Sequence, residues 1–221
     1  MPEPLIVLED VSFAYASGRP VLRDASLQLS AGERAGLSGP TGSGKTTLLH
    51  LIVGLLRPAA GRLVVFSRER WTEADFHEVR CRAGLLFQDA DDQLFCPTVL
   101  EDVAFGPLNL GVPRDEARRR VTHVLEQLDL AGYEGRITDQ LSGGEKRLVA
   151  LATVLAMEPE VLLLDEPTTG LDDHFTARLI EILVALPQVM LIVSHDRDFL
   201  SATATRRLRL LDGGLRENER H

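Results

Sequence analysis

Residues 39–47 read GPTGSGKTT, and this stretch decides how the rest of the chain is interpreted. It follows an apolar, strand-like segment at residues 34–37 and opens a helix-like segment at residues 45–56. Its glycines allow the backbone to curl until several N–H groups point at one spot, and the helix start adds free donors and a positive dipole end. The pattern G-x-x-x-x-G-K-S/T between a strand and a helix therefore predicts a phosphate-binding loop. The residues predicted to bind the nucleotide here are Gly39, Pro40, Thr41, Gly42, Ser43, Gly44, Lys45, Thr46 and Thr47.

Two side chains of this loop indicate its ligand. Lys45 can reach the β- and γ-phosphates of a nucleoside triphosphate, and the Thr46 hydroxyl can ligate Mg²⁺. The alternative is a glycine-rich turn that opens an ordinary helix. The motifs further along the chain exclude that alternative.

Composition limits the class of protein. The chain has 221 residues, 44% of them hydrophobic and 26% charged, which is enough for one large α/β domain with a real core. The net charge of −9 argues against a nucleic-acid partner. Cys81 and Cys96 have no metal-ligand spacing and are expected to be reduced thiols. The first residues do not follow the signal-peptide pattern, and the longest apolar run, near residues 48–56, is too short to span a bilayer, so we expect a soluble protein.

The N-terminal part predicts two antiparallel strands, at residues 5–15 and 21–29, joined by a turn at residues 16–20. Apolar and polar residues alternate along the second strand, as in a half-exposed strand. Phe13 and Tyr15 fall on one face of the first strand. An aromatic ring shortly before a phosphate loop could stack on an adenine, or it could serve only for packing. The residues alone leave both readings open.

The middle of the chain alternates short strands and helices. Gln88 follows a strand predicted at residues 84–87, at the edge of the sheet where α/β folds place ligand chemistry. Its amide could complete the Mg²⁺ shell or hold an attacking water, or it could simply cap a turn. The other predictions are a strand at 63–66, a helix at 74–82, loop-like order at 89–111, and an amphipathic helix at 114–130 with a solvated arginine run at 118–120.

The loop-like segment carries acidic and apolar side chains. Asp89, Asp91 and Asp92 could suggest a cation site, but they lack regular ligand spacing and are interpreted as a solvated acidic turn. The apolar side chains nearby could form a docking surface for another protein. They are Leu94, Phe95 and Phe105.

Residues 141–145, LSGGE, precede a second amphipathic helix. Ser142 can cap this helix, while Gly143 and Gly144 allow a phosphate to approach its N-terminus. The chain thus contains two phosphate-binding helix starts, which one nucleotide cannot easily use within one monomer. A head-to-tail dimer, in which each ATP contacts the Lys45 loop of one subunit and the Ser142 loop of the other, would use both.

The last part of the chain supplies acidic and imidazole side chains. The apolar run at residues 161–164 predicts a buried parallel strand, and Asp165 and Glu166 stand at its carboxyl end. Burying adjacent carboxylates without a function is costly. Asp165 suits Mg²⁺ ligation, direct or through water, and Glu166 suits the orientation or deprotonation of water. His195 follows a buried strand at 189–193 and could contact the γ-phosphate, and residues 206–214 predict a final strand and hairpin turn.

Together these motifs resemble the ATP-binding-cassette (ABC) ATPases over essentially the whole chain. The correspondence includes a Walker A loop at 39–47, a Q-loop glutamine, the LSGGE signature, a Walker B run at 161–166, a D-loop at 170–172 and a switch histidine. The resemblance implies ATP and Mg²⁺ as cofactors and a head-to-tail homodimer. It implies roles in ATP binding for Tyr15, which matches the adenine-stacking position, and for Ser142, Gly143, Gly144, Glu145 and Asp172. It implies catalytic roles for Glu166, His195 and Gln88, with Thr46, Gln88 and Asp165 around Mg²⁺.

The resemblance also implies the fold. We expect a P-loop NTPase of the α/β class, with a mixed or parallel core sheet, an N-terminal antiparallel β-subdomain and a helical subdomain. Residues 1–221 would form one ABC ATPase domain. Residues 1–88 and 158–221 would make the core with its antiparallel part, and about 89–157 the helical subdomain with the signature motif.

A narrower resemblance surrounds Gln88 and the signature. The runs LLFQDADDQLFCPTVLEDVAFGPLNLG and LSGGEKRLVALATVLAMEPEVLLLDEPTTGLD are similar to the ATPase component of energy-coupling-factor (ECF) importers, closest to the cobalt and nickel branch. In that family, residues corresponding to 91–95 form a short helix beside the groove that receives the transmembrane coupling protein. The chain ends soon after Gly214, without the C-terminal dimerisation extension of many vitamin-type relatives, and Asp173 replaces a frequent proline.

The resulting expectation is an ATP hydrolase at the cytoplasmic face of the membrane. It would power the import of cobalt or nickel through a transmembrane coupling protein and a substrate-binding membrane subunit. The alternatives are the ATPase of a vitamin (biotin-type) ECF importer or of another ABC transporter, and a non-transport ABC protein acting on DNA or ribosomes. The last class carries long coiled-coil insertions or paired cassettes, which this sequence lacks. An inactive regulatory dimer is disfavoured because every catalytic position is filled.

Overall fold

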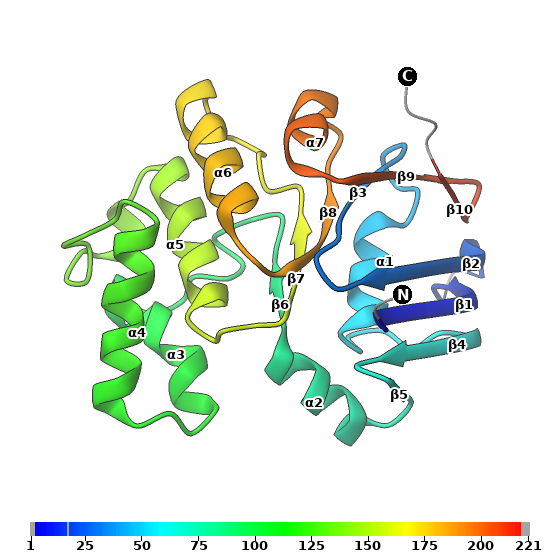
Figure 1. The fold of residues 1–221 in the computed structure, drawn as a ribbon, viewed down its shortest axis with the longest axis horizontal. Helices are drawn as coiled ribbons and strands as arrows, with labels where there is room; N and C mark the ends of the chain where they lie inside the picture. The colour runs from blue at the N-terminus through cyan, green and yellow to red at the C-terminus, as the bar shows by residue number, and fades with distance from the viewer. Residues whose placement is uncertain (1–2, 17, 218–221) are drawn as a thin grey trace.

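The computed structural model describes residues 3–16 and 18–217, so Ser17 of the predicted turn lies outside the described residues. The chain forms three parts that lie side by side (Figure 1). An antiparallel sheet lies on one side, a largely parallel sheet in the middle, and a group of helices on the other side. This arrangement confirms the predicted fold class.

The antiparallel sheet has the strand order β2-β1-β4-β5. In β2, Ala25, Leu27 and Leu29 are buried while the residues between them are exposed, which confirms the predicted alternation. Every pair of neighbouring strands in this sheet is antiparallel. Its strands are β1 (Pro4–Ala14), β2 (Pro20–Ser30), β4 (Ala60–Val65) and β5 (Arg68–Glu69).

The central sheet has the order β10-β9-β3-β8-β7-β6 and is parallel from β9 to β6. Its register decides the position of the site, because Val193 of β8 pairs with Leu37 of β3 on one side and with Asp165 of β7 on the other. The loops that follow these three strands therefore leave the sheet at one edge. The strands are β3 (Arg34–Ser38), β6 (Ala83–Leu86), β7 (Val161–Asp165), β8 (Val189–Val193), β9 (Arg206–Leu211) and β10 (Gly214–Glu217).

The helices divide between the sheet and the helical part. Helices α3, α4 and α5 pack together as the helical part, and α5 also contacts β6 (Figure 1). Helix α6 packs on α7, which in turn contacts β3. The bounds are α1 (Lys45–Ile52), α2 (Glu73–Arg82), α3 (Val99–Asn109), α4 (Arg114–Gln127), η1 (Thr138–Gln140), α5 (Gly143–Leu155), α6 (Asp173–Ala185) and α7 (Arg197–Thr203). None of the described helices is long and apolar enough to cross a membrane.

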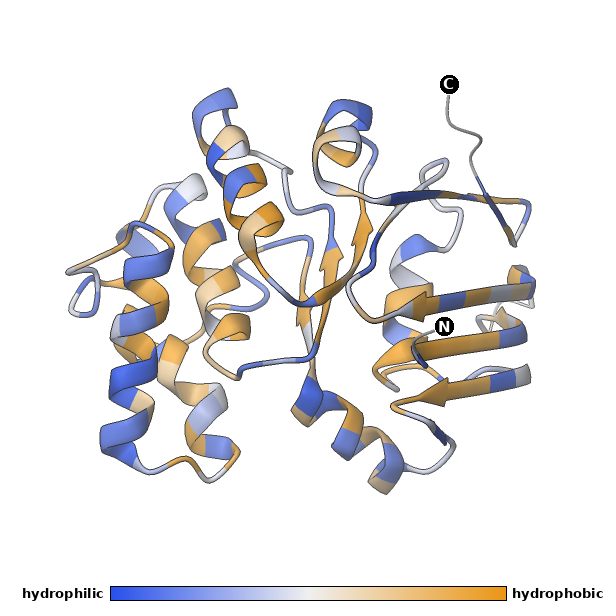
Figure 2. Cartoon of the chain, viewed as in Figure 1, coloured by the Kyte–Doolittle hydropathy of each residue, from blue (hydrophilic) through white to orange (hydrophobic). Residues whose placement is uncertain are grey.

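Two apolar cores meet at the central sheet, whose strands β7 and β8 are almost entirely hydrophobic (Figure 2). Successive residues of β7 point to opposite faces, so Leu163 joins the core shared with the antiparallel sheet while Leu162 and Leu164 join the core shared with α3, α4 and α5. All five residues of β7 and all five of β8 are buried. This explains why both strands read as continuous apolar runs rather than as alternating ones.

The prediction of loop-like order at residues 89–111 is wrong in its second half, because α3 lies there. Thr98 and Glu101 form a reciprocal capping box, and the helix buries Val99 and Val103. Pro107 inside the helix hid the pattern, since proline usually ends a helix. This residue has no N–H to donate, and the helix continues past it to Asn109.

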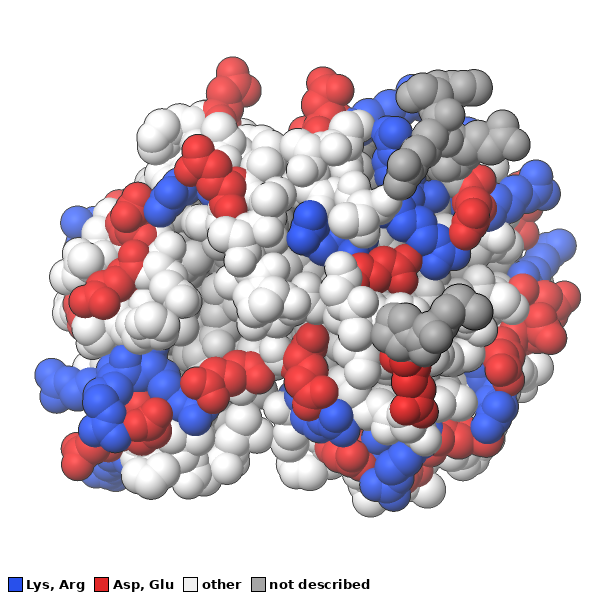
Figure 3. Space-filling model, viewed as in Figure 1, with Lys and Arg blue, Asp and Glu red and all other residues white. Residues whose placement is uncertain are grey.

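Two shorter corrections concern neighbouring segments. The helix expected to reach residue 56 ends at Ile52, and Gly54 follows with a φ of 75°. The short helix expected at residues 91–95 is a hydrogen-bonded turn, in which the N–H groups of Gln93 and Leu94 both donate to the carbonyl of Ala90. The exposed arginines of α4 lie where basic and acidic side chains intermingle (Figure 3), and Arg119 pairs with Glu116 at 2.5 Å.

Candidate active site

The phosphate-binding loop joins β3 to α1 in the predicted strand–loop–helix form. Gly44 precedes the helix with a φ of 104°, and a Cβ atom at this position would come within 2.6 Å of Val21 Cγ1. Only glycine satisfies both conditions. No side chain caps this helix start, and its first turn contains no acidic residue. Its N–H groups therefore remain available for an anion.

Lys45 provides the positive charge of this loop. Its Nζ donates to the carbonyl oxygens of Gly39 at 3.0 Å and Pro40 at 3.2 Å, which holds the ammonium group over the loop. Only 8% of the residue is exposed. The loop therefore presents backbone donors and one ammonium group to the same point, and this geometry suits a phosphate.

Asp165 ends β7 in a buried position beside the loop. Burial raises the pKa of its carboxyl group, while the nearby Thr46 hydroxyl and the charges of His50 and Lys45 act in the opposite direction. Its Oδ1 atom is buried and has no hydrogen-bond partner within the part of the chain that the structure describes. A buried carboxylate oxygen with an unused lone pair, next to a threonine hydroxyl, fits a Mg²⁺ ion.

Glu166 follows directly and contacts the end of β8. Its Oε2 atom accepts from the backbone N–H of His195 at 3.2 Å and lies 2.7 Å from His195 Nδ1. The backbone of Glu166 is in the left-handed region, with a φ of 45°, and its N–H donates to the carbonyl of Val193 at 2.9 Å. The carboxylate is thus fixed by the neighbouring strand, with 8% of the residue exposed.

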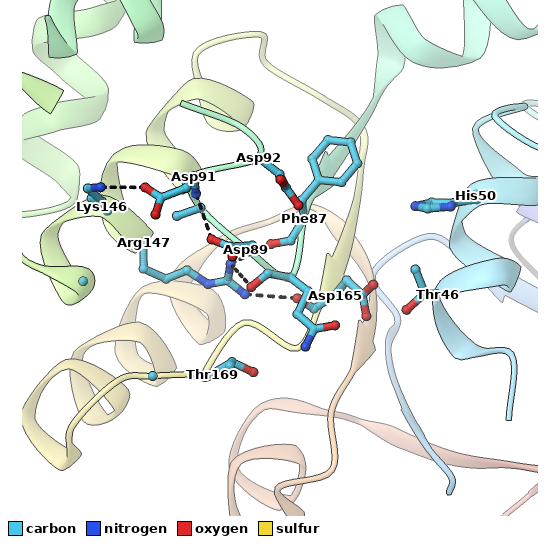
Figure 4. A pocket seen from close by; sticks show the side chains of 14 residues that line it. Thr46, His50, Phe87, Asp89, Asp91, Asp92, Lys146, Arg147, Asp165 and Thr169 are labelled. Carbon is cyan, nitrogen blue, oxygen red and sulfur yellow. Dashed lines mark hydrogen bonds and ion pairs between the residues drawn. The ribbon is translucent and has the colours of Figure 1, made fainter. Parts of the chain in front are cut away.

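A cavity of about 510 Å³ lies between α1 and the start of α5. Thr46 and His50 lie on the α1 side and Asp165 on the β7 side (Figure 4). Gln88 lines the same cavity from the loop that follows β6. Gln88 is therefore brought to the same cavity as the predicted Mg²⁺ ligands Thr46 and Asp165. The remaining lining residues are Phe87, Asp89, Ala90, Asp91, Asp92, Gly143, Lys146, Arg147, Thr169 and Gly170.

Two of the three acidic residues of this loop have partners within the protein. Asp91 Oδ1 accepts from Lys146 Nζ at 2.6 Å, and Asp89 Oδ1 accepts from the N–H of Asp91 at 3.0 Å (Figure 4). Among the described residues, no group of three or more histidine, cysteine, aspartate and glutamate side chains could hold a metal ion. Asp89, Asp91 and Asp92 are all exposed, as expected for a solvated turn.

Arg147 is a residue of the site that the sequence analysis missed. Its guanidinium donates to five backbone carbonyls, those of Phe87, Gln88, Asp165, Glu166 and Pro167, at 2.6 to 3.0 Å. Burial lowers the pKa of Arg147 to about 10, which leaves it charged at neutral pH. It therefore ties the Gln88 loop and the Asp165–Glu166 turn to α5. No local sequence signal distinguishes it from the other arginines of the chain.

The second predicted phosphate site opens α5 at the far side of the cavity. Ser142 caps the helix as predicted, with its side chain accepting from the N–H of Glu145 at 3.3 Å. Gly143 faces open space, since nothing lies within 4 Å of an added Cβ atom. Gly144 instead packs against Phe175, whose ring a Cβ atom would meet at 2.5 Å. Packing therefore requires glycine at position 144, while position 143 leaves the start of α5 open.

Two further predicted residues are Tyr15, beside the phosphate-binding loop, and Asp172, at the start of α6. The Tyr15 hydroxyl forms a hydrogen bond of 3.0 Å with Thr47 Oγ1, and its ring packs edge-to-face on Phe13. Tyr15 is 46% exposed, so part of its surface remains free beside the loop. Asp172 caps α6 by accepting from the N–H of Phe175 at 2.8 Å. Both side chains thus have structural contacts in the monomer.

A phosphate-binding loop after β3 and an acidic pair at the end of β7, two strands away in the same parallel sheet, define a P-loop nucleotide-hydrolysing protein. Residues 22–169 match the family described as ABC transporter, and the chain belongs to that family. The ATPase domains of this family are the ATP-hydrolysing subunits of transporters and bind ATP with Mg²⁺.

Two curated relatives cover most of the chain. One is the energy-coupling factor transporter ATP-binding protein EcfA of Methanothermobacter thermautotrophicus, 45% identical over 96% of this chain and 69% of that protein. The other is the cobalt import ATP-binding protein CbiO of Rhodobacter capsulatus, 44% identical over 92% of this chain and 74% of that protein.

Two solved structures share the fold. The structure of cbiO1 from Clostridium perfringens, described as part of the ABC transporter complex cbiONQ, superposes with a TM-score of 0.89 at 32% identity, covering 97% of this chain and 87% of that one. The ATP-binding cassette MJ0796, in a dimeric post-hydrolysis state bound to ADP and Pi, superposes with a TM-score of 0.86 at 26% identity. This match covers 98% of this chain and all of that one.

Proposed function

We propose that the chain is the ATPase subunit of an energy-coupling-factor importer for a divalent metal ion, cobalt or nickel. The observation that carries the proposal is an apolar groove beside the Gln88 loop, where the protein could receive a membrane partner. Similarity to EcfA and CbiO supports the importer class and the cargo. In this arrangement the protein is peripheral, at the cytoplasmic face of the membrane.

The groove has a volume of about 270 Å³ and is lined by residues of α2, β6, α3 and α5. Phe95 and Phe105 line it, pack edge-to-face with ring centroids 4.8 Å apart, and remain 65% and 46% exposed. Exposed aromatic pairs of this kind suit a protein partner. Phe87 lines both this groove and the cavity that contains Asp165, so a partner in the groove would lie one side chain away from the site.

The two helix starts support a head-to-tail homodimer. The start of α1 offers donors and Lys45, while the start of α5 offers the open face at Gly143. In the closed dimer, ATP would bind to the loop at residues 39–47 of one subunit and to Ser142, Gly143 and Gly144 of the other. Contacts with the γ-phosphate across the interface exist only in the closed state, so hydrolysis would remove them and reopen the dimer.

The chain's own residues would carry the hydrolysis step. Glu166 would orient the attacking water and accept its proton, and His195 would hold the Glu166 carboxylate and reach the γ-phosphate. The 2.7 Å contact between the two side chains supports this pairing. Thr46, Gln88 and Asp165 would hold Mg²⁺, which neutralises phosphate charge when bound. Tyr15 would stack on the adenine with the part of its ring that is exposed.

Glu166→Gln tests the assignment of the base. The amide keeps the size of the side chain but cannot accept the proton, so ATP turnover should fall by at least about 100-fold while ATP binding persists. The variant should accumulate as a dimer with ATP, as measured by size-exclusion chromatography with light scattering. Turnover at the wild-type rate would refute the role of Glu166 as the base.

A pull-down tests the cargo. Tagged Glu166→Gln protein, expressed in its own cells, would be recovered with ATP from detergent-solubilised membranes, and its partners and bound metal identified. A small transmembrane coupling protein with a metal-binding membrane subunit would support the metal importer. A vitamin-binding subunit would support the vitamin alternative, and recovery without any membrane protein would contradict the importer class.

A further inference from the structure

The start of α5 combines two features that oppose each other. An anion-binding helix start gains from positive charge, yet the first turn of α5 carries the carboxylate of Glu145. Glu145 Oε2 accepts from the N–H of Ser142 at 2.8 Å, so the protein's own anion already occupies part of the positive end of this helix. Without compensation, this charge would repel an approaching phosphate.

The other carboxylate oxygen has two donors from the preceding loop. Tyr133 donates its hydroxyl to Glu145 Oε1 at 2.6 Å, and Arg136 Nη1 lies 3.0 Å from the same atom. The Arg136 guanidinium also stacks on the Tyr133 ring, 3.5 Å from its centroid. The three side chains therefore form one closed cluster, and Glu145 is 21% exposed within it.

The charge of Glu145 persists at neutral pH. The Tyr133 hydroxyl and the Ser142 N–H lower the pKa of Glu145 to about 2, so the carboxylate stays ionised. Protonation cannot relieve the repulsion, and the opposite charge of Arg136 is the compensation that the structure provides. The loop is anchored independently, because the carbonyls of Glu134 and Arg136 accept from the N–H groups of Leu100 and Val99 at 2.9 and 3.1 Å. Removing the Arg136 side chain therefore leaves these backbone contacts in place.

We propose that Arg136 and Tyr133 are positioning residues for ATP at the start of α5, where they neutralise and orient the Glu145 carboxylate so that a phosphate can approach Ser142 and Gly143. This inference rests on the composite site proposed above. It assigns a function to the loop that carries Tyr133 and Arg136, which lies outside the LSGGE motif at residues 141–145. Arg136 acts through its charge, and Tyr133 acts by fixing the direction of the carboxylate.

The test compares variants in the Glu166→Gln background, where dimer formation can be followed as a function of ATP concentration by light scattering. Arg136→Met should raise the half-maximal ATP concentration by about five- to tenfold, because an uncompensated charge then faces the phosphate. Arg136→Lys keeps the charge and should recover most of the loss. Tyr133→Phe should cause about a two- to threefold increase, since Arg136 remains.

A double-mutant cycle between Arg136 and Glu145 separates neutralisation of the carboxylate from a merely structural role of Arg136. With Glu145→Gln added, Arg136→Met should change the half-maximal ATP concentration by less than about twofold, because no charge remains to be neutralised. Arg119→Met is the matched control, since Arg119 also pairs with a glutamate but lies on α4. It should leave dimer formation at the parental value.

Three results would count against the inference. An unchanged half-maximal concentration in Arg136→Met would overturn it. An equal effect of Arg136→Met with and without Glu145→Gln would also overturn it, because the residue would then act through the fold. If the Glu166→Gln parent forms no dimer at saturating ATP, the composite site itself fails, and this result is distinguishable because it affects every variant alike.

Discussion

The two helix starts that are proposed to bind the nucleotide are built in opposite ways. Helix α1 begins after a glycine, has no side-chain cap and no acid in its first turn, and carries Lys45. Helix α5 begins with a full capping box between Ser142 and Glu145 and carries a negative charge at the same place. One start is left open for an anion, while the other is stabilised within the protein and neutralised from outside the helix.

This difference shows that two helix starts with similar backbone geometry can be suited to bind an anion with different strength. The open start of α1 offers several free N–H groups and an ammonium group, so it is suited to hold a nucleotide continuously. The capped start of α5 has fewer free donors, and Arg136 pairs with its Glu145 carboxylate. Contacts there are suited to form and break during a cycle, as the proposed dimer that opens after each hydrolysis would require.

The largest expected effect comes from removing the charge of the open start. Lys45→Met should lower ATP turnover by about 100- to 1000-fold, because the ammonium group is the positive side chain that the structure places over the loop. Turnover is measured by phosphate release at saturating ATP. Retention of more than a tenth of the wild-type rate would mean that the backbone donors suffice and that the two starts differ less than their sequences indicate.

Blocking the capped start should be almost as severe but through a different step. Ser142→Arg places a long side chain at the exposed face next to Gly143, so closure of the dimer should fail and turnover should fall by about 100-fold. Binding of a fluorescent ATP analogue to the monomer should persist, in contrast to Lys45→Met. Loss of monomer binding in Ser142→Arg would show that both starts act on one nucleotide within one chain.

A smaller effect is expected from the glycines of α5. Gly144→Ala would bring a methyl group within 2.5 Å of the Phe175 ring, which should lower the free energy of unfolding by about 1–3 kcal/mol. Gly143→Ala is the matched comparison, since its added methyl group meets open space. Urea unfolding of both variants measures the difference. Equal stability would show that Phe175 can move aside without cost.

The smallest effect concerns acid stability. The pKa of Glu145 is lowered from 4.5 to about 2 in the folded protein, so its stabilising contribution is complete above pH 4.5 and is lost as the pH falls toward 2. Glu145→Gln cannot titrate there. Between pH 5 and 3, the wild type should therefore lose about 1 kcal/mol more stability than this variant, as measured by urea midpoints. Parallel pH profiles would contradict the depressed pKa.

The local motifs of the chain could be predicted because each is a short-range pattern. Residues 39–47 and 141–145 specify their own loop and cap geometry through glycine, serine and lysine at fixed spacing. Strands β7 and β8 were predicted because runs of four and five consecutive apolar residues between polar segments have few alternatives. Helix α3 was missed because Pro107 interrupts its pattern, and only packing against α4 and α5 outweighs that local signal.

The sequence by itself determined which groups are present: the phosphate loop, the acidic pair, the capped glycines and the family they define. The tertiary structure decided which distant groups cooperate. Val193 brings the ends of β3 and β7 together, Arg147 joins five carbonyls of two loops, and the loop before η1 neutralises Glu145. These pairings depend on strand order and on long side chains reaching between separate elements, and no spacing along one chain segment encodes a distance across the fold.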